Sequence, residues 1–301
     1  MGIVNKVKKG VFNIGRSVLI TLNPRLFDRL YYRLKLGRRC NLRDPRRLSE
    51  KIIWLKHNWY DARAEVYADK YAVRQLLQER GYGALLIPLI GVYSSIAEFD
   101  FDALPESFVL KAAHGSGMNL ICWNKKALQR ADVEANVKRW LKANYYYQCA
   151  EKHYRPMPKR VVCEELLVEP GRSSLTEYKI MCYNGSPQFV MVYYDRSGDS
   201  ALSCCYDTEW NKLPVYSGKF TRGEREIPRP EQFSYMLEIA RDISTGFPLM
   251  RVDIYEVGGQ VYFGEMTFFH NAGVCCFTPD EYDTIFGEGL ALSGKDEKSD
   301  I

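Results

Sequence analysis

A pair of apolar segments joined by Asn184-Gly185 constrains the fold of this chain more than any other feature. Residues 176–184 and 188–195 both have the composition of strands, and Asn-Gly favours the tight turn that connects two antiparallel strands. A second hairpin is predicted for residues 249–257 and 260–267, on either side of a Gly-Gly pair. Two such hairpins favour a sheet of mainly antiparallel strands, because parallel strands need long crossover connections.

The remaining elements are predicted from the spacing of apolar residues and from glycine or proline breaks. Helices are expected at residues 1–40 with a break at Pro24, and at 48–60, 69–79, 131–147 and 231–245. Further strands are expected at residues 85–92, 108–112, 119–123 and 160–167. Helices therefore come first and hairpins separated by helices follow, which is an α+β layout. No G-x-G-x-x-G sequence opens a helix after a strand, and this argues against a doubly wound dinucleotide-binding fold.

Composition and charge narrow the classes of protein to consider. The chain has 301 residues, of which 26% are charged, and its net charge of +5 does not indicate binding to nucleic acid. The positive charge is concentrated in the first fifty residues. This region could contact an anionic membrane surface or an anionic polymer, or it could be a solvated basic face.

The nine cysteines and four histidines do not indicate a disulfide framework or a zinc site, because no C-x-x-C occurs and the histidines are scattered. Buried free thiols in a reducing cytosol are expected instead. Residues 18–22 form too short an apolar run to span a membrane, and no small-residue cleavage site indicates a signal peptide. We expect a cytoplasmic protein, with the inner face of the cytoplasmic membrane as the surface that the basic N-terminal region could meet.

Lys111 lies in an apolar segment and is followed by His114-Gly115-Ser116-Gly117. A lysine in a buried strand is costly unless its ammonium meets an anion. A glycine-containing turn beside it can bring backbone N–H groups close to phosphate oxygens. This combination is consistent with a polyphosphate site, but a strand-end lysine that reaches water beside an ordinary turn explains it equally well.

Two carboxylates are predicted to lie close together in the last hairpin. Arg251, Asp253 and Tyr255 alternate along one strand and so share a face, and Glu265 lies on the partner strand. Facing carboxylates repel unless a cation lies between them, and oxygen ligands of this kind suit Mg²⁺. Arg251 could then contact a phosphate. The alternative is a charge pair of Arg251 with one of the carboxylates on a solvent-exposed face.

Four further polar residues are ambiguous by themselves. Glu164 and Glu165 end a strand and could bind a ribose hydroxyl or an adenine amine, although an exposed strand end is the simpler interpretation. Lys179, in the first hairpin, is either a phosphate ligand or a surface lysine. Lys70, near the start of a helix, indicates nothing in isolation.

Taken in order, these segments resemble the ATP-grasp superfamily, and within it the TupA-like branch of teichuronopeptide biosynthesis. The resemblance covers roughly residues 40–287, and its matching segments are 46–52, Trp54, 69–74, 108–111, 114–117, 164–165, 177–179, 184–185, 251–255 and 263–268. It implies two α+β lobes of mainly antiparallel strands that enclose ATP.

The resemblance also implies a role for each matching residue. The implied cofactor-binding residues are Lys70, Lys111, His114, Gly115, Ser116, Gly117, Glu164, Glu165 and Lys179. The implied catalytic residues are Lys111, Lys179 and Arg251, and the implied magnesium ligands are Asp253, Glu265 and Asn271. Many members of the superfamily have Asn or Asp two residues after the metal-binding Glu, where this chain has Thr267. Either Asn271 supplies the missing oxygen or a second metal ion binds more loosely.

The activity implied by the resemblance is that of an ADP-forming ligase that joins a carboxylate to an amine through an acyl phosphate. The implied substrates are ATP, an amino acid or other amine, and a uronic acid of a bacterial surface polysaccharide. A glycosyltransferase or phosphotransferase of the same pathway is the alternative, although the only D-x-D sequence, at residues 100–102, lies in a predicted loop. A non-catalytic scaffold that docks on a membrane through its basic N-terminus is a third hypothesis.

Five regions are expected along the chain. They are a basic helical extension (1–40), a helical and α/β subdomain (41–105), a small lobe with the phosphate loop (106–168), a large lobe with the metal site (169–292) and a frayed tail (293–301).

Overall fold

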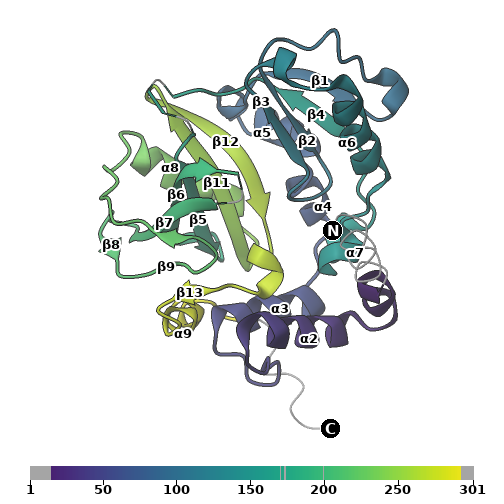
Figure 1. The fold of residues 1–301 in the computed structure, drawn as a ribbon. Helices are drawn as coiled ribbons and strands as arrows, with labels where there is room; N and C mark the ends of the chain where they lie inside the picture. The colour runs from purple at the N-terminus through teal and green to yellow at the C-terminus, as the bar shows by residue number, and fades with distance from the viewer. Residues whose placement is uncertain (1–14, 170, 173, 199, 293–301) are drawn as a thin grey trace.

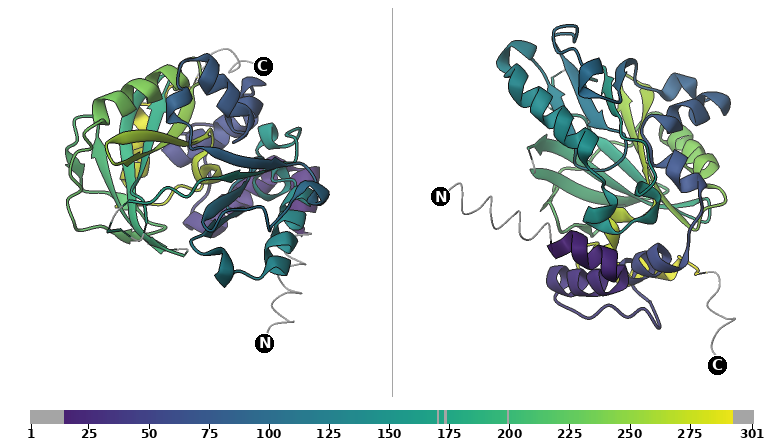
Figure 2. Two further views of the ribbon diagram at one scale, coloured as in Figure 1. Left: turned by 90° about the horizontal axis from the view of Figure 1, so that it is seen from above. Right: turned by 90° about the vertical axis from the view of Figure 1, so that its right-hand side faces the viewer.

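The structure, a computed structural model, describes residues 15–169, 171–172, 174–198 and 200–292. The predicted tail and the start of the predicted N-terminal helix lie outside these residues. Figures 1 and 2 show two separate β-sheets, with a group of helices gathered at one end of both. This arrangement confirms the expected α+β class.

The smaller sheet is antiparallel and has the strand order β1-β4-β2-β3. Its strands are β1 (Leu89–Tyr93), β2 (Phe108–Ala112), β3 (Asn119–Cys122) and β4 (Val161–Glu164). Helix α6 (Arg130–Lys142) packs on it through Val133 and Val137, which are buried beside Phe108. Because β1 precedes residue 106, this sheet contains strands from both sides of a predicted domain boundary, and the boundaries themselves stay a prediction.

The larger sheet has seven strands in the order β10-β7-β6-β5-β11-β12, with β8 paired to β7. Its strands are β5 (Glu177–Tyr183), β6 (Ser186–Ser197), β7 (Ser200–Asp207), β8 (Lys212–Leu213), β10 (Thr221–Arg222), β11 (Leu249–Val257) and β12 (Gln260–Thr267). Only the pairing of β10 with β7 is parallel among the described residues. Helix α8 (Phe233–Ser244) covers β5, β6 and β11 with buried Phe233, Met236 and Ile239.

Both predicted hairpins are confirmed. Tyr183 pairs with Ser186, and the intervening Asn184 and Gly185 have φ values of +48° and +80°. Positive φ at both central residues is the geometry that matches the twist of the flanking strands, and it selects Asn-Gly. The second hairpin turns at Gly258-Gly259 between β11 and β12.

The helices at one end belong to both termini of the described chain. They are residues 15–22, α2 (Pro24–Leu36), α3 (Leu48–Asn58) and α9 (Tyr282–Glu288). The helices α4 (Arg63–Tyr67) and α5 (Ala72–Glu79) lie nearer the smaller sheet (Figure 1). The break expected at Pro24 is present, because Pro24 opens α2 and the Asn23 side chain caps it by accepting the Leu26 N–H at 2.9 Å. Helix α3 packs against α9 and against η5 (His270–Gly273), so the helical layer holds the segment that follows β12.

Several elements were not predicted. They are α4, β7, β8, β10, α9, and the short pieces η1 (Gly83–Leu85), η2 (Ile96–Glu98), η3 (Lys125–Ala127), α7 (Tyr146–Cys149), η4 (Lys152–Tyr154), β9 (Tyr216–Ser217) and β13 (Phe277–Thr278). Elements of two to five residues contain less than two turns or too few alternations to show a period. The expected free thiols are confirmed for all nine cysteines, of which seven are buried. No helix among the described residues is long and apolar enough to cross a membrane.

Candidate active site

Asp253 and Glu265 face each other in register across β11 and β12. Lys179 is the register partner of Asp253 on the other side, so the three residues stand in one row across β5, β11 and β12. A bulge at Gly264 produces this alignment, because the pairing shifts by one residue between Ile254 and Asp253. Without the extra residue, Asp253 would pair with position 264 and Glu265 would point to the opposite face.

Arg251 binds both carboxylates. Its Nε and Nη2 donate to the two oxygens of Asp253 at 2.6 and 2.8 Å, and Nη2 also donates to Glu265 Oε1 at 3.0 Å. Arg251 and Asp253 are only 7% and 2% exposed. The charge pair considered from sequence is therefore present, but it is buried and does not lie on a solvent-exposed face.

Lys179 completes the buried group from β5. Its Nζ lies 2.5 Å from Asp253 Oδ2 and 2.8 Å from Glu177 Oε2, and Arg196 binds the other side of Glu177. Burial opposes the ammonium charge, but Asp253 and Glu177 outweigh it and raise the pKa of Lys179. Lys179 is thus a buried cation in a charge network, and its interpretation as a surface lysine is wrong.

Lys70 connects the two sheets. Its Nζ donates to the Gly115 carbonyl at 2.8 Å and lies 3.1 Å from Glu265 Oε2. Its backbone N–H donates to the Ala113 carbonyl, just beyond β2. Burial by itself would raise the pKa of Glu265, yet the positive charges of Lys70, Arg251 and Lys179 hold this pKa at about 2.

Lys111 pairs with Glu164 across the neighbouring strands β2 and β4. The distance from Lys111 Nζ to Glu164 Oε2 is 2.6 Å, and Arg74 donates to the other Glu164 oxygen at 2.9 Å. Glu164 is 6% exposed, so it is not the free strand-end acid that local sequence suggested. Glu165 is exposed, and its N–H donates to the Pro88 carbonyl.

The predicted phosphate loop has a fixed start and an exposed tip. His114 is fully buried, and its Nδ1 accepts the Arg160 backbone N–H while its Nε2 donates to the Trp140 carbonyl. Gly115 is buried, and a Cβ there would lie 2.5 Å from Met118 Cε and 3.0 Å from the side chain of Tyr145. Ser116 and Gly117 are exposed, and Gly117 has φ +71°. Ser116 and Gly117 are therefore the part of the loop that can approach a ligand.

His270 is a partner of Arg251 that the sequence did not indicate. Arg251 Nη1 donates to His270 Nδ1 at 2.7 Å, and burial together with the neighbouring cations lowers the pKa of His270 well below its usual value. The neutral ring must then carry its proton on Nε2, which lies 3.2 Å from the Asn271 amide. The structure places Asn271 Nδ2 at that contact, and because two N–H groups cannot form a hydrogen bond, we infer that the amide is flipped and presents its oxygen.

The carboxylate pair fits magnesium by donor type. Mg²⁺ takes oxygen ligands, and it usually keeps waters or substrate phosphates in most positions. No group of three or more acidic, histidine or cysteine side chains that could hold a metal occurs in the described part of the chain. Asp253 and Glu265 would hold such an ion only together with oxygens from phosphate or water.

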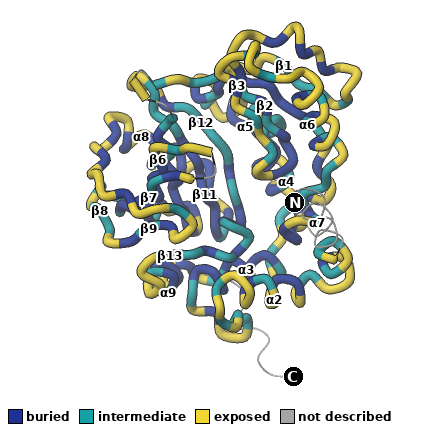
Figure 3. Tube along the Cα trace, viewed as in Figure 1, coloured by how far each residue is buried: buried dark blue, intermediate teal, exposed yellow. Residues whose placement is uncertain are grey.

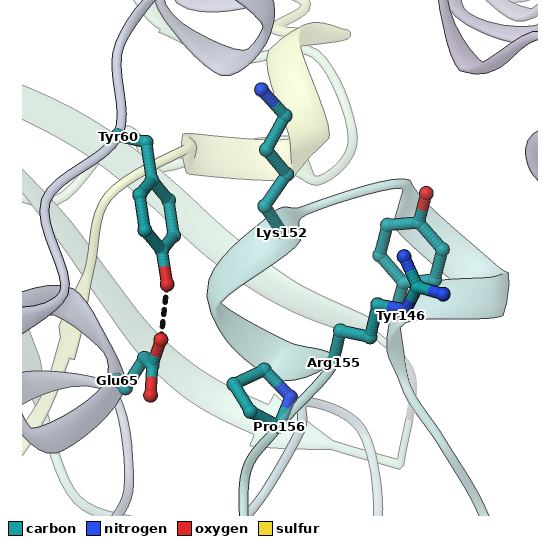
Figure 4. A pocket seen from close by; sticks show the side chains of 6 residues that line it. All are labelled: Tyr60, Glu65, Tyr146, Lys152, Arg155 and Pro156. Atoms are coloured by element: carbon teal, nitrogen blue, oxygen red, sulfur yellow. Dashed lines mark hydrogen bonds between the residues drawn. The ribbon is translucent and has the colours of Figure 1, made fainter.

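A cavity of about 610 Å³ lies elsewhere on the surface, and none of the predicted site residues lines it. Its lining residues are Tyr60, Glu65, Tyr146, Lys152, Arg155 and Pro156. Figure 4 shows the Tyr60 hydroxyl bonded to Glu65 on one side and the two cations on the other. His153, next to Lys152, packs its ring 5.8 Å from the ring of Phe269, which precedes His270.

Residues 50–291 match the family model described as TupA-like ATP-grasp. The chain belongs to this family. This membership confirms the ATP-grasp fold that the resemblance implied. Among solved structures, D-alanine–D-alanine ligase from Bacillus anthracis complexed with ATP is similar at 16% identity and a TM-score of 0.42, over 68% of this chain and 55% of that one. N5-carboxyaminoimidazole synthetase from Staphylococcus aureus complexed with ADP is similar at 13% identity and a TM-score of 0.37, over 67% of this chain and 44% of that one.

This TupA-like chain thus spans about half the length of the solved chains that it matches. No curated protein sequence matches it.

Sequence reasoning overlooked three residues that contact the predicted site, namely Glu177, Arg74 and His270. Glu177 had a signal, because it precedes Lys179 by two positions and so shares its face of β5. Arg74 and His270 had none, since their contacts come from other elements.

Proposed function

We propose that this TupA-like protein is an ATP-dependent, ADP-forming ligase that joins a carboxylate to an amine. The observation that carries the proposal is the double contact of Lys70 with Gly115 and Glu265, which links the phosphate loop to the carboxylate row. Family membership supports ATP as the substrate that these cations serve. Lys70 contacts that loop, while Lys179 and Arg251 contact the carboxylate row, and these three positive charges suit a triphosphate.

The proposed reaction has two steps. A substrate carboxylate oxygen attacks the γ-phosphorus of ATP, the bond to the β-phosphate oxygen breaks, and ADP leaves. The amine then attacks the carbonyl carbon of the acyl phosphate, the carbon–oxygen bond breaks, and phosphate and a proton are released. Magnesium, held by Asp253 and Glu265 with Asn271 as a candidate third ligand, would neutralise phosphate charge. Arg251 would face the transferred phosphoryl group, fixed by its bond to His270.

The cations that would bind phosphate are held on the carboxylates in this structure. Arg251 and Lys179 occupy both oxygens of Asp253, while Arg251 and Lys70 occupy those of Glu265. With Mg-ATP bound, Asp253 and Glu265 would hold the ion, and the side chains of Lys70, Lys179 and Arg251 would turn from the carboxylates to the phosphates. Because each carboxylate and each cation would gain a new partner of opposite charge, no buried charge would be left unpaired.

For the substrates, we propose an amino acid and a uronic acid of a bacterial surface polysaccharide, in the cytoplasm where ATP is available. The resemblance to proteins of teichuronopeptide biosynthesis supports this choice. The cavity beside η4 supports an acidic sugar, because Lys152 and Arg155 offer positive charge next to the rings of Tyr60 and Tyr146. A transferase that uses a nucleotide sugar is the alternative.

The decisive experiment measures ADP release from ATP with each amino acid and uronate, alone and together. We expect release only when both substrates are present. Lys111→Ala should abolish ATP binding while the protein stays folded, and the double variant Asp253→Asn/Glu265→Gln should abolish turnover. Full activity in either variant, release of AMP, or stronger thermal stabilisation by a nucleotide sugar than by ATP would contradict the ligase assignment.

A further inference from the structure

Helix α2 exposes a row of three leucines along one side. Leu26, Leu30 and Leu34 are 42%, 51% and 72% exposed. Residues four apart lie above one another on a helix, so the three side chains form one apolar stripe. Asp28 and Tyr32 are buried on the other side of the helix, and Phe27 is buried at the edge of the stripe. A soluble surface seldom aligns large apolar side chains in this way without a partner.

A row of arginines runs parallel to the leucine stripe. Arg25, Arg29 and Arg33 each precede one of the leucines by a single position, and all three are exposed. The only acidic residue of α2 is Asp28, which is 2% exposed and forms a salt bridge with Lys56 at 2.7 Å. The exposed face of α2 therefore carries apolar and positive groups with no negative charge of its own.

The position of α2 leaves this face accessible. Figure 1 places α2 at the bottom of the molecule, at the end away from β1 and α6, with α3 beside it. In the helical segment that precedes α2, Val18 and Leu22 are 50% and 77% exposed. Exposed apolar side chains thus continue on both sides of the Asn23 cap.

We propose that the exposed face of α2 is a docking surface for an anionic lipid membrane. The leucines would enter the boundary between headgroups and acyl chains, and the arginines would bind lipid phosphates beside them. A second copy of this chain suits the face less well, because pairing two such helices would bring two uncompensated arginine rows together. Anionic headgroups supply the missing negative charge. The inference does not depend on the proposed ligase reaction.

The test uses flotation of the full chain with vesicles of phosphatidylglycerol and phosphatidylcholine, and with phosphatidylcholine alone. We expect capture only by the anionic vesicles, weakening as salt is raised. R29S/R33S should lower the affinity about fivefold for each arginine. L26S/L30S/L34S should also weaken capture, and more of the loss should persist at high salt. The matched control is K138S/R139S, which removes two exposed charges from α6 at the other end of the molecule.

Three results would overturn the proposal. The first is that both α2 variants are captured as well as the unchanged protein. This result would be clearest if K6S/K8S/K9S, outside the described residues, abolished capture. The second is equal capture by phosphatidylcholine alone. The third is a lipid-free dimer that L26S/L30S/L34S converts to a monomer in sedimentation analysis, which would assign the stripe to a second copy. Unchanged circular dichroism and thermal unfolding of the variants ensure that a loss of capture reports on the surface.

Discussion

The ammonium of Lys70 lies 3.1 Å from a carboxylate oxygen of Glu265 and donates a hydrogen bond to the Gly115 carbonyl. One side chain from the helical region thus connects the loop after β2 with strand β12 of the other sheet. The contact places a cation where the predicted phosphate loop and the predicted metal ligand Glu265 share a partner. We propose this junction as the place where the triphosphate of ATP binds.

Replacing Lys70 tests that junction. Lys70→Met should leave the fold intact, because the side chain is 15% exposed and the methionine stem fills a similar space. We expect ATP affinity to fall by about tenfold to a hundredfold, since a hydrogen bond to a charged group contributes roughly 1.5–3 kcal/mol. Isothermal titration with Mg-ATP measures the change. Lys126→Met, at an exposed position of η3, is the matched control and should bind as the wild type does.

Removing the charge of each carboxylate should have unequal effects on stability. Asp253→Asn leaves the buried cations Arg251 and Lys179 short of a partner, so the free energy of unfolding should fall by about 3 kcal/mol. Glu265→Gln should cost less than this, because its side chain is 27% exposed and water can replace part of the lost pairing. Urea denaturation at neutral pH gives both values. Equal losses would mean that the two carboxylates do not differ in burial as described.

Gly264 controls which face of the sheet carries Glu265. A Cβ at this position would lie 2.9 Å from the Tyr255 ring and 3.0 Å from the Asp253 carbonyl, so Gly264→Ala must distort the bulge. We expect a loss of about 1–3 kcal/mol in stability and a larger loss of turnover, since Glu265 would leave its alignment with Asp253. Gly83→Ala is the control, because its Cβ would meet only Gln78 at 3.6 Å. A fully active Gly264→Ala would show that the bulge is not needed.

Glu151 should make the protein less stable as pH rises. Burial raises the pKa of Glu151 from 4.5 to about 8, so between these values the folded state keeps a proton that the unfolded state has lost. The free energy of unfolding should then decrease from pH 5 to pH 8, on the order of 3 kcal/mol from this group. Glu151→Gln should remove that part of the slope, and Glu106→Gln, at an exposed position, should not. Denaturation curves of the unchanged protein and both variants at several pH values measure these slopes.

Much of the local structure could be predicted from sequence, because the signals are local. Asn184-Gly185 requires positive φ at two successive residues, and both were found there. Pro24 opens α2, as its missing N–H and fixed φ allow. The strands β7 and β8 were not predicted, although each pairs with the strand immediately before it in the chain. Strand β8 has only two residues, too few to show an alternation.

The chemical character of the candidate site was partly accessible from sequence for the same reason. Alternation along β11 was sufficient to put Arg251 and Asp253 on one face. The alternation could not predict whether that face is exposed to water, because its burial depends on the side chains that other elements pack against it. Here the neighbours are Lys179 from β5 and His270 from η5, and they convert a possible surface pair into a buried network.

Sequence by itself determined the two hairpins, the break before α2, the free thiols and the residue types of the site, since each depends on a few neighbouring positions. Sequence placed Glu265 near Asp253, but only the structure shows the bulge that puts both on one face, because one bulged residue reverses the face of every side chain beyond it. It likewise decided that Lys70 reaches Glu265 and that the leucines of α2 stay exposed. These outcomes depend on packing between segments far apart in the chain, which no local pattern encodes.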